Sequence, residues 1–272
     1  MAPPPFLILE PEVDSPVLVE VPHAGTYVDP ETSRLLMTPA RAVAQDADLL
    51  VDELYADAPS VGATLLAAKH SRYVVDLNRG EGDVDGASVR GVPGPLRASR
   101  GVIWRLSGAG EPVLAAPLER AELERRLTRV YRPYHEALAG LIAGKVRRFG
   151  HAVVVAAHSM PSVGVTSRGA RALRADVVPG TRGRTSAAAR YIDVVDAKAR
   201  SAGLTVAHDD PYRGGFTTLH YGAPARGVHV VQVELARRLY MDEATLQPSP
   251  RFMETRRFCR ELTAALVELS RS

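Results

Sequence analysis

The sequence lacks features that would point to a secreted or membrane protein. Its single cysteine, Cys259, excludes an internal disulfide bond and is typical of a reducing cytoplasm. Cys259 lies in an expected helix, where we interpret it as a packing residue. No apolar run approaches the roughly 20 residues of a membrane-spanning helix. The first residues also lack the basic region and long apolar stretch of a signal peptide. We therefore expect a cytoplasmic protein with no membrane partner.

An excess of charge of one sign is also lacking. The chain has 34 basic and 31 acidic residues, which gives a net charge of +3. Its basic residues are scattered in pairs such as Arg125–Arg126, as on solvated helix faces, so we expect no nucleic-acid partner. With 272 residues, of which 46% are hydrophobic, the chain is long enough to bury a large core.

Short apolar runs alternate with amphipathic patterns along the chain. The runs predict strands at 5–9, 17–21, 63–67, 73–77, 153–157, 204–207 and 228–233. Helices are expected near 47–57, 117–149, 185–202 and 251–270, with Pro133 bending or splitting the second of these. This alternation predicts an α/β fold with a mostly parallel or mixed central sheet and helices on both faces.

The stretch 80–102 is rich in glycine, proline and charge, as in a domain linker or a long loop. Apolar runs of the same character continue on both sides of it. We therefore expect a long surface loop within a single domain that spans residues 1–272.

Polar side chains follow several of the expected strands. His23 comes after 17–21, Asn78 and Arg79 come after 73–77, and His158 comes after 153–157. Glu234 comes directly after the run 228–233. Ligands of open α/β sheets bind beyond the carboxyl ends of the strands, so these side chains are expected to meet at one edge.

Two imidazoles and one carboxylate form a common catalytic zinc site with a coordination position left for water. His23 and His158 are the natural imidazoles. The carboxylate is Asp46 or Asp48, both at the beginning of an expected helix. For either aspartate the alternative is a capping or charge interaction with the helix N-terminus.

Glu234 needs a task or a partner, because a carboxylate on a buried strand is costly without one. It is either a general base beside the metal or the partner of an arginine such as Arg237. Arg79 has a planar fork that matches a carboxylate, and Asn78 adds a donor and an acceptor. The alternative for Arg79 is a structural pair with Asp76.

The segment 209–222 contains the paired glycines Gly214 and Gly215 beside Tyr212, Arg213 and Thr217. Paired glycines allow the backbone to approach a ligand or allow a loop to move, although a plain turn is the competing interpretation.

Eight motifs, in the order of the chain, resemble those of the N-formylglutamate amidohydrolase (deformylase) family. They are VPHAG at 21–25, DAD at 46–48, SRYVVDLNR at 71–79, YRPYH at 131–135, AHS at 157–159, RADVVPGTRGRTS at 174–186, PYRGGFTTLHYG at 211–222 and VQVELARRLYM at 231–241. This family resembles the zinc carboxypeptidases and acyl-amino-acid deacylases, which implies a zinc exopeptidase (phosphorylase/hydrolase-like) fold.

The resemblance implies hydrolysis of the amide of an N-acyl amino acid such as N-formyl-L-glutamate, with Zn²⁺ or another divalent cation. It implies His23 and His158 as metal ligands, with Asp46 as the first choice for the third ligand. It also implies Glu234 as general base and proton shuttle. Arg72 and Arg213 become candidates for stabilising the oxyanion. The expected substrate-binding residues are Asn78, Arg79, Tyr212, Gly214, Gly215 and Thr217.

One position departs from the family pattern. Family members often carry an arginine in the GGxxTR stretch, where this chain has Leu219. An arginine there suits a glutamate side chain, so Leu219 bears on substrate specificity. The alternatives are a hydrolase of another N-acyl amino acid or short peptide, and a ligand-binding relative without turnover. The sequence leaves the oligomeric state open.

Overall fold

The computed structural model describes residues 3–92, 100–165 and 169–271. The chain forms two compact units, each assembled from several segments. Unit 1 consists of Met1–Leu7, Pro22–Leu49 and Ala67–Gly140, and unit 2 consists of Ile8–Val21, Leu50–Leu66 and Leu141–Ser272. The expected single domain over 1–272 stays a prediction.

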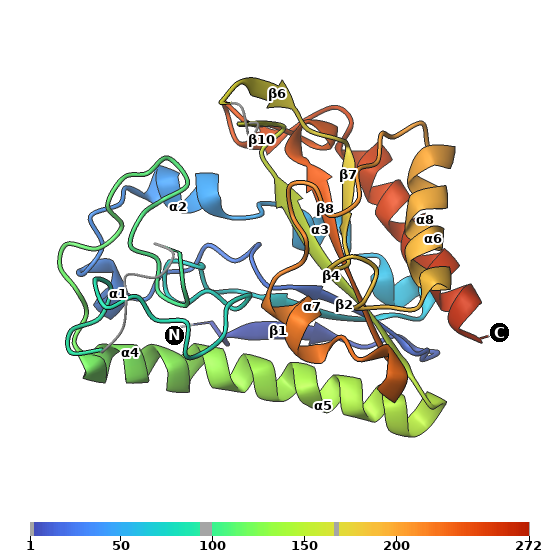
Figure 1. Ribbon diagram of the computed structural model, residues 1–272, viewed down its shortest axis with the longest axis horizontal. Helices are drawn as coiled ribbons and strands as arrows, with labels where there is room; N and C mark the ends of the chain where they lie inside the picture. Colours follow the sequence, from blue (N-terminus) through green and yellow to red (C-terminus); the bar gives the residue numbers. More distant parts are fainter. Residues whose placement is uncertain (1–2, 93–99, 166–168, 272) are drawn as a thin grey trace. The chain divides into compact units, whose positions relative to one another are not determined.

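A six-stranded sheet has the order β1-β3-β2-β4-β8-β7 (Figure 1). Its strands are β1 (Phe6–Leu9), β2 (Val17–Val21), β3 (Thr64–Ala68), β4 (Ala152–Met160), β7 (Val177–Gly180) and β8 (Val228–Ala236). Strands β2, β4 and β8 are parallel neighbours, whereas the edge strand β7 is antiparallel to β8. Every residue of β2 and β4 is buried, as in central strands covered on both faces. The predicted α/β class with a mostly parallel, mixed sheet is confirmed.

Helices contact both faces of β8. Glu20 and Gln232 share one face, because each pairs with the same residue of β4. Successive side chains of a strand alternate, so His229 points to the opposite face. The ring of Tyr191 on α6 (Ala189–Ser201) packs 4.8 Å from the ring of His229. On the first face, Thr217 Oγ1 of α7 (Phe216–Tyr221) donates to Glu20 Oε1 at 3.2 Å.

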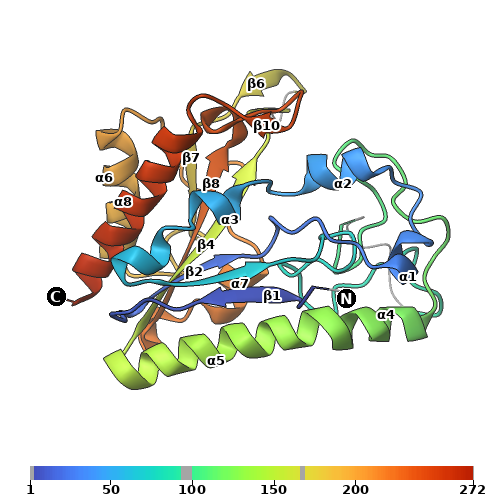
Figure 2. The same ribbon diagram turned by 180° about the vertical axis from the view of Figure 1, so that it is seen from behind.

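Helix α8 (Phe252–Arg271) lies beside α6 in both views (Figures 1 and 2). It buries Phe258, Leu262 and Leu266 at four-residue spacing, which puts them on one helix face. Cys259 is fully buried in the same helix, where burial raises the pKa of its thiol to about 12, so it is a packing residue. Within the described ranges, no helix is long and apolar enough to cross a membrane.

The helical pattern over 117–149 changes character just before Pro133. It comprises α4 (Arg120–Arg126), the π-helical turn η2 (Leu127–Tyr131) and α5 (Arg132–Phe149). Proline has no N–H, and its ring clashes with the carbonyl four residues earlier, here that of Arg129. The wider π turn lies at that place, so the expected irregularity at Pro133 takes this form.

The expected strand at 73–77 is wrong, because this segment forms turns. Its backbone groups are satisfied outside the sheet. Arg126 Nη1 donates to Tyr73 O at 3.2 Å and to Val74 O at 3.0 Å. Asp76 N donates to Val102 O at 2.8 Å.

Three further expectations need correction. The run 204–207 forms a single bridge, Val206 with Val177, instead of a strand. The helix expected at 47–57 is shortened to α3 (Val51–Leu54) and follows α2 (Ala40–Asp46). In the stretch 80–102, residues 93–99 lie outside the described residues, and the others form no helix or strand. Val89 and Val102 are fully buried, so this stretch is not simply a surface loop.

The remaining elements are short. They are the helix α1 (Pro30–Ser33), the 3₁₀ turns η1 (Ala58–Val61), η3 (Pro224–Arg226) and η4 (Arg237–Leu239), and the strand pairs β5 (Val163–Val165) with β6 (Arg171–Leu173) and β9 (Met241–Asp242) with β10 (Gln247–Pro248).

Candidate active site

His23 follows β2 and is held by a buried carboxylate. The side chain of His23 is 1% exposed, and its Nε2 lies 2.8 Å from Asp76 Oδ1. Asp76 is fully buried and also accepts from Trp104 Nε1 at 2.8 Å and from Asn78 N at 2.8 Å. Burial alone would raise the pKa of the Asp76 carboxyl, but the charges of Arg72 and Arg79 and the hydrogen bond from His23 hold it well below its usual range. Asp76 is therefore an ionised acceptor that fixes the His23 ring.

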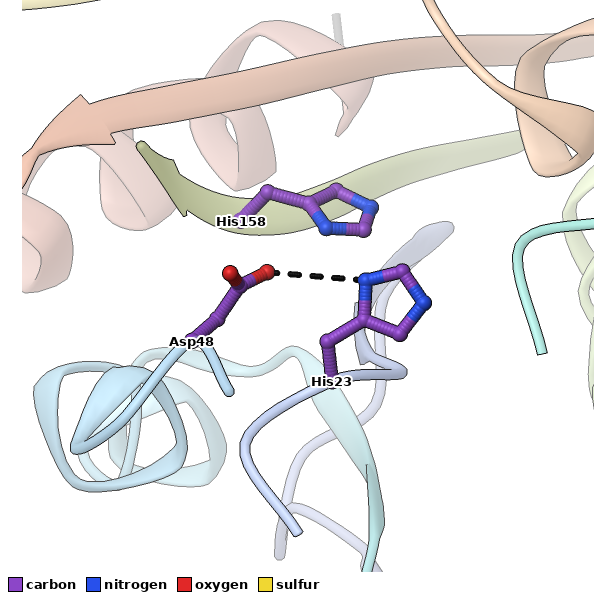
Figure 3. A group of neighbouring side chains, drawn as sticks. All are labelled: His23, Asp48 and His158. Carbon is purple, nitrogen blue, oxygen red and sulfur yellow. Dashed lines mark ion pairs between the residues drawn. The ribbon is translucent and has the colours of Figure 1, made fainter. Parts of the chain in front are cut away.

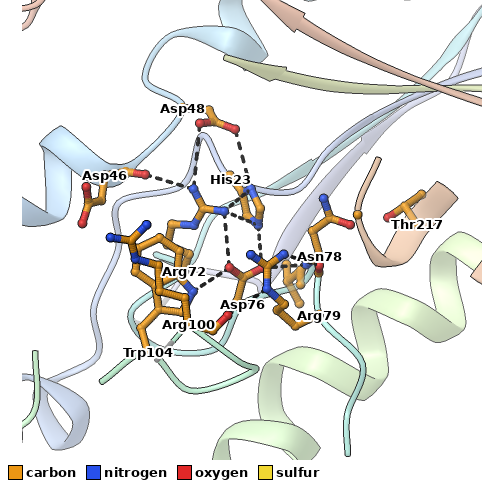
Figure 4. Close-up of polar contacts among 12 residues, drawn as sticks. His23, Asp46, Asp48, Arg72, Asp76, Asn78, Arg79, Arg100, Trp104 and Thr217 are labelled. Carbon is orange, nitrogen blue, oxygen red and sulfur yellow. Dashed lines mark hydrogen bonds and ion pairs between the residues drawn. The ribbon is translucent and has the colours of Figure 1, made fainter. Parts of the chain in front are cut away.

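Asp76 determines which His23 nitrogen carries the proton. Arg72 Nη2 lies near both ring nitrogens, 2.7 Å from His23 Nδ1 and 3.2 Å from His23 Nε2, and 3.3 Å from Asp76 Oδ2 (Figure 4). An ionised carboxylate only accepts, so the His23 nitrogen that faces Asp76, Nε2, is assigned the hydrogen. This tautomer presents the Nδ1 lone pair, as a metal ligand requires. The guanidinium itself stacks over the Trp104 ring, 4.6 Å from its centroid.

Asp48, not Asp46, turns toward His23. Asp48 is 2% exposed, its Oδ2 lies 3.6 Å from His23 Nδ1, and its backbone N donates to His23 O at 2.9 Å. Asp46 ends α2 and accepts hydrogen bonds from Tyr73 Oη and, at 2.6 Å, from Gly108 N. The choice of Asp46 over Asp48 is therefore corrected: the carboxylate of Asp46 secures neighbouring loops.

His158 and Glu234 are register partners on neighbouring parallel strands of unit 2. His158 on β4 pairs with Glu234 on β8, so their side chains leave the sheet on the same face. They are 3% and 5% exposed, respectively. Gln232, two residues before Glu234 on the same face, donates from Nε2 to Glu234 Oε1 at 2.8 Å.

His23, Asp48 and His158 form one buried group (Figure 3). Each offers one ligand atom, and these atoms all lie within 4.8 Å of one another. Two imidazoles and a carboxylate are the donor set of a common catalytic zinc site, which keeps one position for water or substrate. The chemistry, burial and tautomer of these residues therefore suit a divalent cation.

Comparison of the sequence with known proteins identifies the family of the chain. Residues 15–241 match the sequence profile of the N-formylglutamate amidohydrolase family. The chain is 35% identical to an N-formylglutamate deformylase of Pseudomonas aeruginosa over 84% of this chain and 83% of that protein. It is 28% identical to one of Pseudomonas putida, over 84% and 82%.

A crystal structure of an N-formylglutamate amidohydrolase from Ralstonia eutropha JMP134 superposes with a TM-score of 0.91 and 33% identity, over 98% of each chain. The chain belongs to the N-formylglutamate amidohydrolase family. The eight sequence motifs that resemble the family therefore lie in a chain that shares the fold of this amidohydrolase.

Asn78 and Arg79, the expected carboxylate clamp of this amidohydrolase, lie in unit 1 beside Asp76. Asn78 is 4% exposed. Arg79 Nε donates to Arg100 O at 2.8 Å and Arg79 Nη1 donates to Asn78 O at 2.9 Å. These bonds to backbone carbonyls fix the direction of the guanidinium group. The binding of a substrate carboxylate by this pair stays a prediction.

The residues expected in the glycine loop lie in unit 2 before and within α7. Gly215 N donates to Gln232 Oε1 at 2.9 Å, and Thr217 is fully buried. Tyr212 Oη accepts from Arg174 Nη1 at 3.3 Å. Arg213 is exposed, so its proposed role at the oxyanion stays a prediction, as does that of Arg72.

Sequence reasoning gave too little weight to two residues of this site. It treated Asp76 only as a partner of Arg79, whereas Asp76 orients His23. The signal was a carboxylate inside an apolar run, the same signal that singled out Glu234. Gln232 received no role, although it shares a face with Glu234 at a spacing of two residues.

Proposed function

We propose that this protein hydrolyses N-formyl-L-glutamate to formate and L-glutamate, with Zn²⁺ or a similar divalent cation at His23, Asp48 and His158. The main support for this proposal is that these three side chains form one buried group in a member of the N-formylglutamate amidohydrolase family. By the same resemblance we assign the protein to histidine degradation.

A cation with this donor set supplies Lewis acidity, which polarises the acyl carbonyl and acidifies water. The residues of the chain do the rest. Glu234 lies on the same sheet face as His158, where its carboxylate takes a proton from the attacking water and delivers it to the departing amine. Arg72 is the cationic group nearest to His23 Nδ1, which suits a role in stabilising the oxyanion.

Substrate binding is assigned to Asn78 and Arg79. The guanidinium group of Arg79 is oriented by two backbone carbonyls, so it is prearranged for a planar carboxylate. A substrate with a free α-carboxylate fits such a group.

The test measures formate released from N-formyl-L-glutamate by protein with a determined metal content. We expect about one equivalent of divalent metal, and a loss of about 100-fold or more in kcat for Glu234→Gln, because the general base is removed while the shape is retained. A pure ligand-binding protein would keep its affinity in Glu234→Gln and have no rate to lose. A protein that binds no divalent metal at micromolar concentrations would exclude the mechanism.

A second candidate function keeps the metal and changes the substrate to another N-acyl amino acid or a short peptide. Leu219 motivates it, because this side chain on α7 is apolar and 60% exposed where relatives often carry arginine. A panel of formyl, acetyl and succinyl amino acids separates the two. If formylglutamate is hydrolysed fastest by orders of magnitude, the second candidate is excluded.

A further inference from the structure

A buried amide connects Glu234 to the glycine loop. Gln232 lies on β8, is 3% exposed, and donates from Nε2 to Glu234 Oε1 at 2.8 Å. At its other end, Gln232 Oε1 accepts from the backbone N–H of Gly215 at 2.9 Å. Gln232 is thus a bridge of two hydrogen bonds between the expected base and Gly215, the N-cap residue of α7.

The direction of this bridge is fixed by chemistry. A backbone N–H only donates, so the amide atom that faces Gly215 must be the oxygen. The amide NH₂ group must then face Glu234. A carboxylate oxygen accepts there, so the bridge holds Glu234 in one rotamer.

The loop end of the bridge has little freedom. Gly214 has φ +98°, and a Cβ atom on it would lie 2.4 Å from Thr218 Oγ1. Only glycine fits this close turn, which directs the N–H of Gly215 toward β8. The position of the loop is therefore transmitted to the Glu234 side chain through one residue.

We propose that Gln232 is a positioning residue, which sets the rotamer of Glu234 and makes it depend on the glycine loop 211–215. The inference rests on the proposed function, because Glu234 matters as a base only if the protein is a hydrolase. In this assignment Gln232 acts through Glu234.

Two variants separate positioning from loop support. Gln232→Met keeps the shape and removes both hydrogen bonds. Gln232→Glu keeps an acceptor for Gly215 N–H but replaces the donor to Glu234 by a like charge. If Gln232 only supported the loop, Gln232→Glu would keep its kcat. We expect both variants to lose about 10- to 100-fold in kcat with KM changed less than about twofold, as for a misplaced catalytic group.

A double-mutant cycle tests whether the effect runs through Glu234. In a Glu234→Gln background, Gln232→Met should cause no further loss of kcat. An equal loss with and without Glu234 would overturn the proposal. The matched control is Ser186→Ala, which removes buried hydrogen bonds of Ser186 Oγ to Val230 O (2.6 Å) and Thr181 O (3.2 Å) beside the same strand. It should keep the wild-type kcat.

A crystal structure of Gln232→Met gives a readout that needs no activity. We expect Glu234 to leave its wild-type rotamer while His158 keeps its place. If Glu234 is unchanged, the positioning role is wrong whatever the substrate. If wild-type protein releases no formate, the proposed function fails, and the wild-type assay alone shows this.

Discussion

The ring of His23 is oriented mainly by one buried carboxylate, that of Asp76. Asp76 accepts from His23 Nε2 at 2.8 Å, while Arg72 Nη2 approaches Nδ1 at 2.7 Å. The contact with Asp76 selects the tautomer with the lone pair on Nδ1. Carboxylates that bond the far nitrogen of a metal-binding histidine raise its basicity and fix its ring.

We therefore predict that Asp76→Asn weakens divalent metal binding by about 10- to 100-fold, because a neutral amide accepts from Nε2–H more weakly than a carboxylate and raises the basicity of Nδ1 less. Zinc titration against a competing chelator measures the change. The matched control is Asp85→Asn, because Asp85 is also fully buried and pairs with Arg105 at 3.1 Å in the same unit. Equal zinc affinity in the two variants would contradict the role of Asp76.

Asp46 and Asp48 show what the sequence leaves open at this scale. Both carboxylates adjoin the same helix and offer the same chemistry. The backbone separates them: α2 ends at Asp46, and Ala47 is extended with φ −70° and ψ 151°. That turn sends Asp48 toward His23 and leaves Asp46 to Tyr73 Oη and Gly108 N. The sequence does not show at which residue a helix ends to within one or two positions. It therefore cannot decide which of two aspartates only two residues apart points toward His23.

Elements were predicted well where burial is continuous. The segments that became β2 and β4 are buried over their whole length and β8 is buried after its first residue, which is typical of central parallel strands. Strand β7 was missed because it is a short edge strand that contains Pro179. The segment 73–77 is equally apolar, but side chains of α4 and other partners, not a strand, satisfy its backbone. The apolar content of a segment shows that it is buried. It does not show whether its backbone N–H and C=O groups form hydrogen bonds with a strand or with side chains.

Arg126 is therefore expected to hold the turn that carries Asp76. It is fully buried, its Nε donates to Glu122 Oε1 at 2.7 Å, and its Nη1 donates to two backbone carbonyls. We predict that Arg126→Met lowers the free energy of unfolding by about 3 kcal/mol, within the range for breaking a buried pair. Urea unfolding measures the change.

The control on the same helical segment is Arg129→Met. The Arg129 side chain is 63% exposed and lies 3.7 Å from Glu31, so its loss should cost about 1 kcal/mol or less. If both variants unfold at the same urea concentration, Arg126 does not support the turn.

The beginning of β8 carries a pH dependence. Burial, with the nearby His151 and Arg190, lowers the pKa of His229 to about 4. An unfolded histidine titrates near about 6.5. The folded state therefore favours neutral His229, so its contribution to stability is complete above about pH 6.5 and declines as the pH falls toward about 4.

We predict that wild-type protein loses more stability than His229→Gln between pH 7.5 and pH 5, in urea unfolding at fixed salt. His151→Gln should show an intermediate loss, because it removes one of the groups that disfavour the protonated form of His229. A wild-type loss no larger than that of His229→Gln would show that another group dominates this pH range.

At the scale of the whole molecule, the site collects residues that are far apart in the sequence. His23 follows β2, Asp48 follows α2 and His158 lies on β4, and their ligand atoms lie within 4.8 Å of one another. The rule that ligands bind beyond parallel strand ends singled out the two histidines in the sequence, although only His23 follows its strand, since His158 lies within β4 two residues before its end. It gave no information on the aspartate, which follows a short helix instead of a strand.

A cation that binds only the folded chain stabilises it by mass action, by about 2.7 kcal/mol at 100 times its dissociation constant. For a chain of this size we expect zinc at that ratio to raise Tm by about 5–10 °C over chelator-treated protein. Asp48→Asn should lose most of this shift, because one of three ligands is removed. Asp46→Asn should keep the shift even if its Tm without metal is lower, because Asp46 bonds loops and not the cation. A zinc shift that disappears in Asp46→Asn and persists in Asp48→Asn would reverse the ligand assignment.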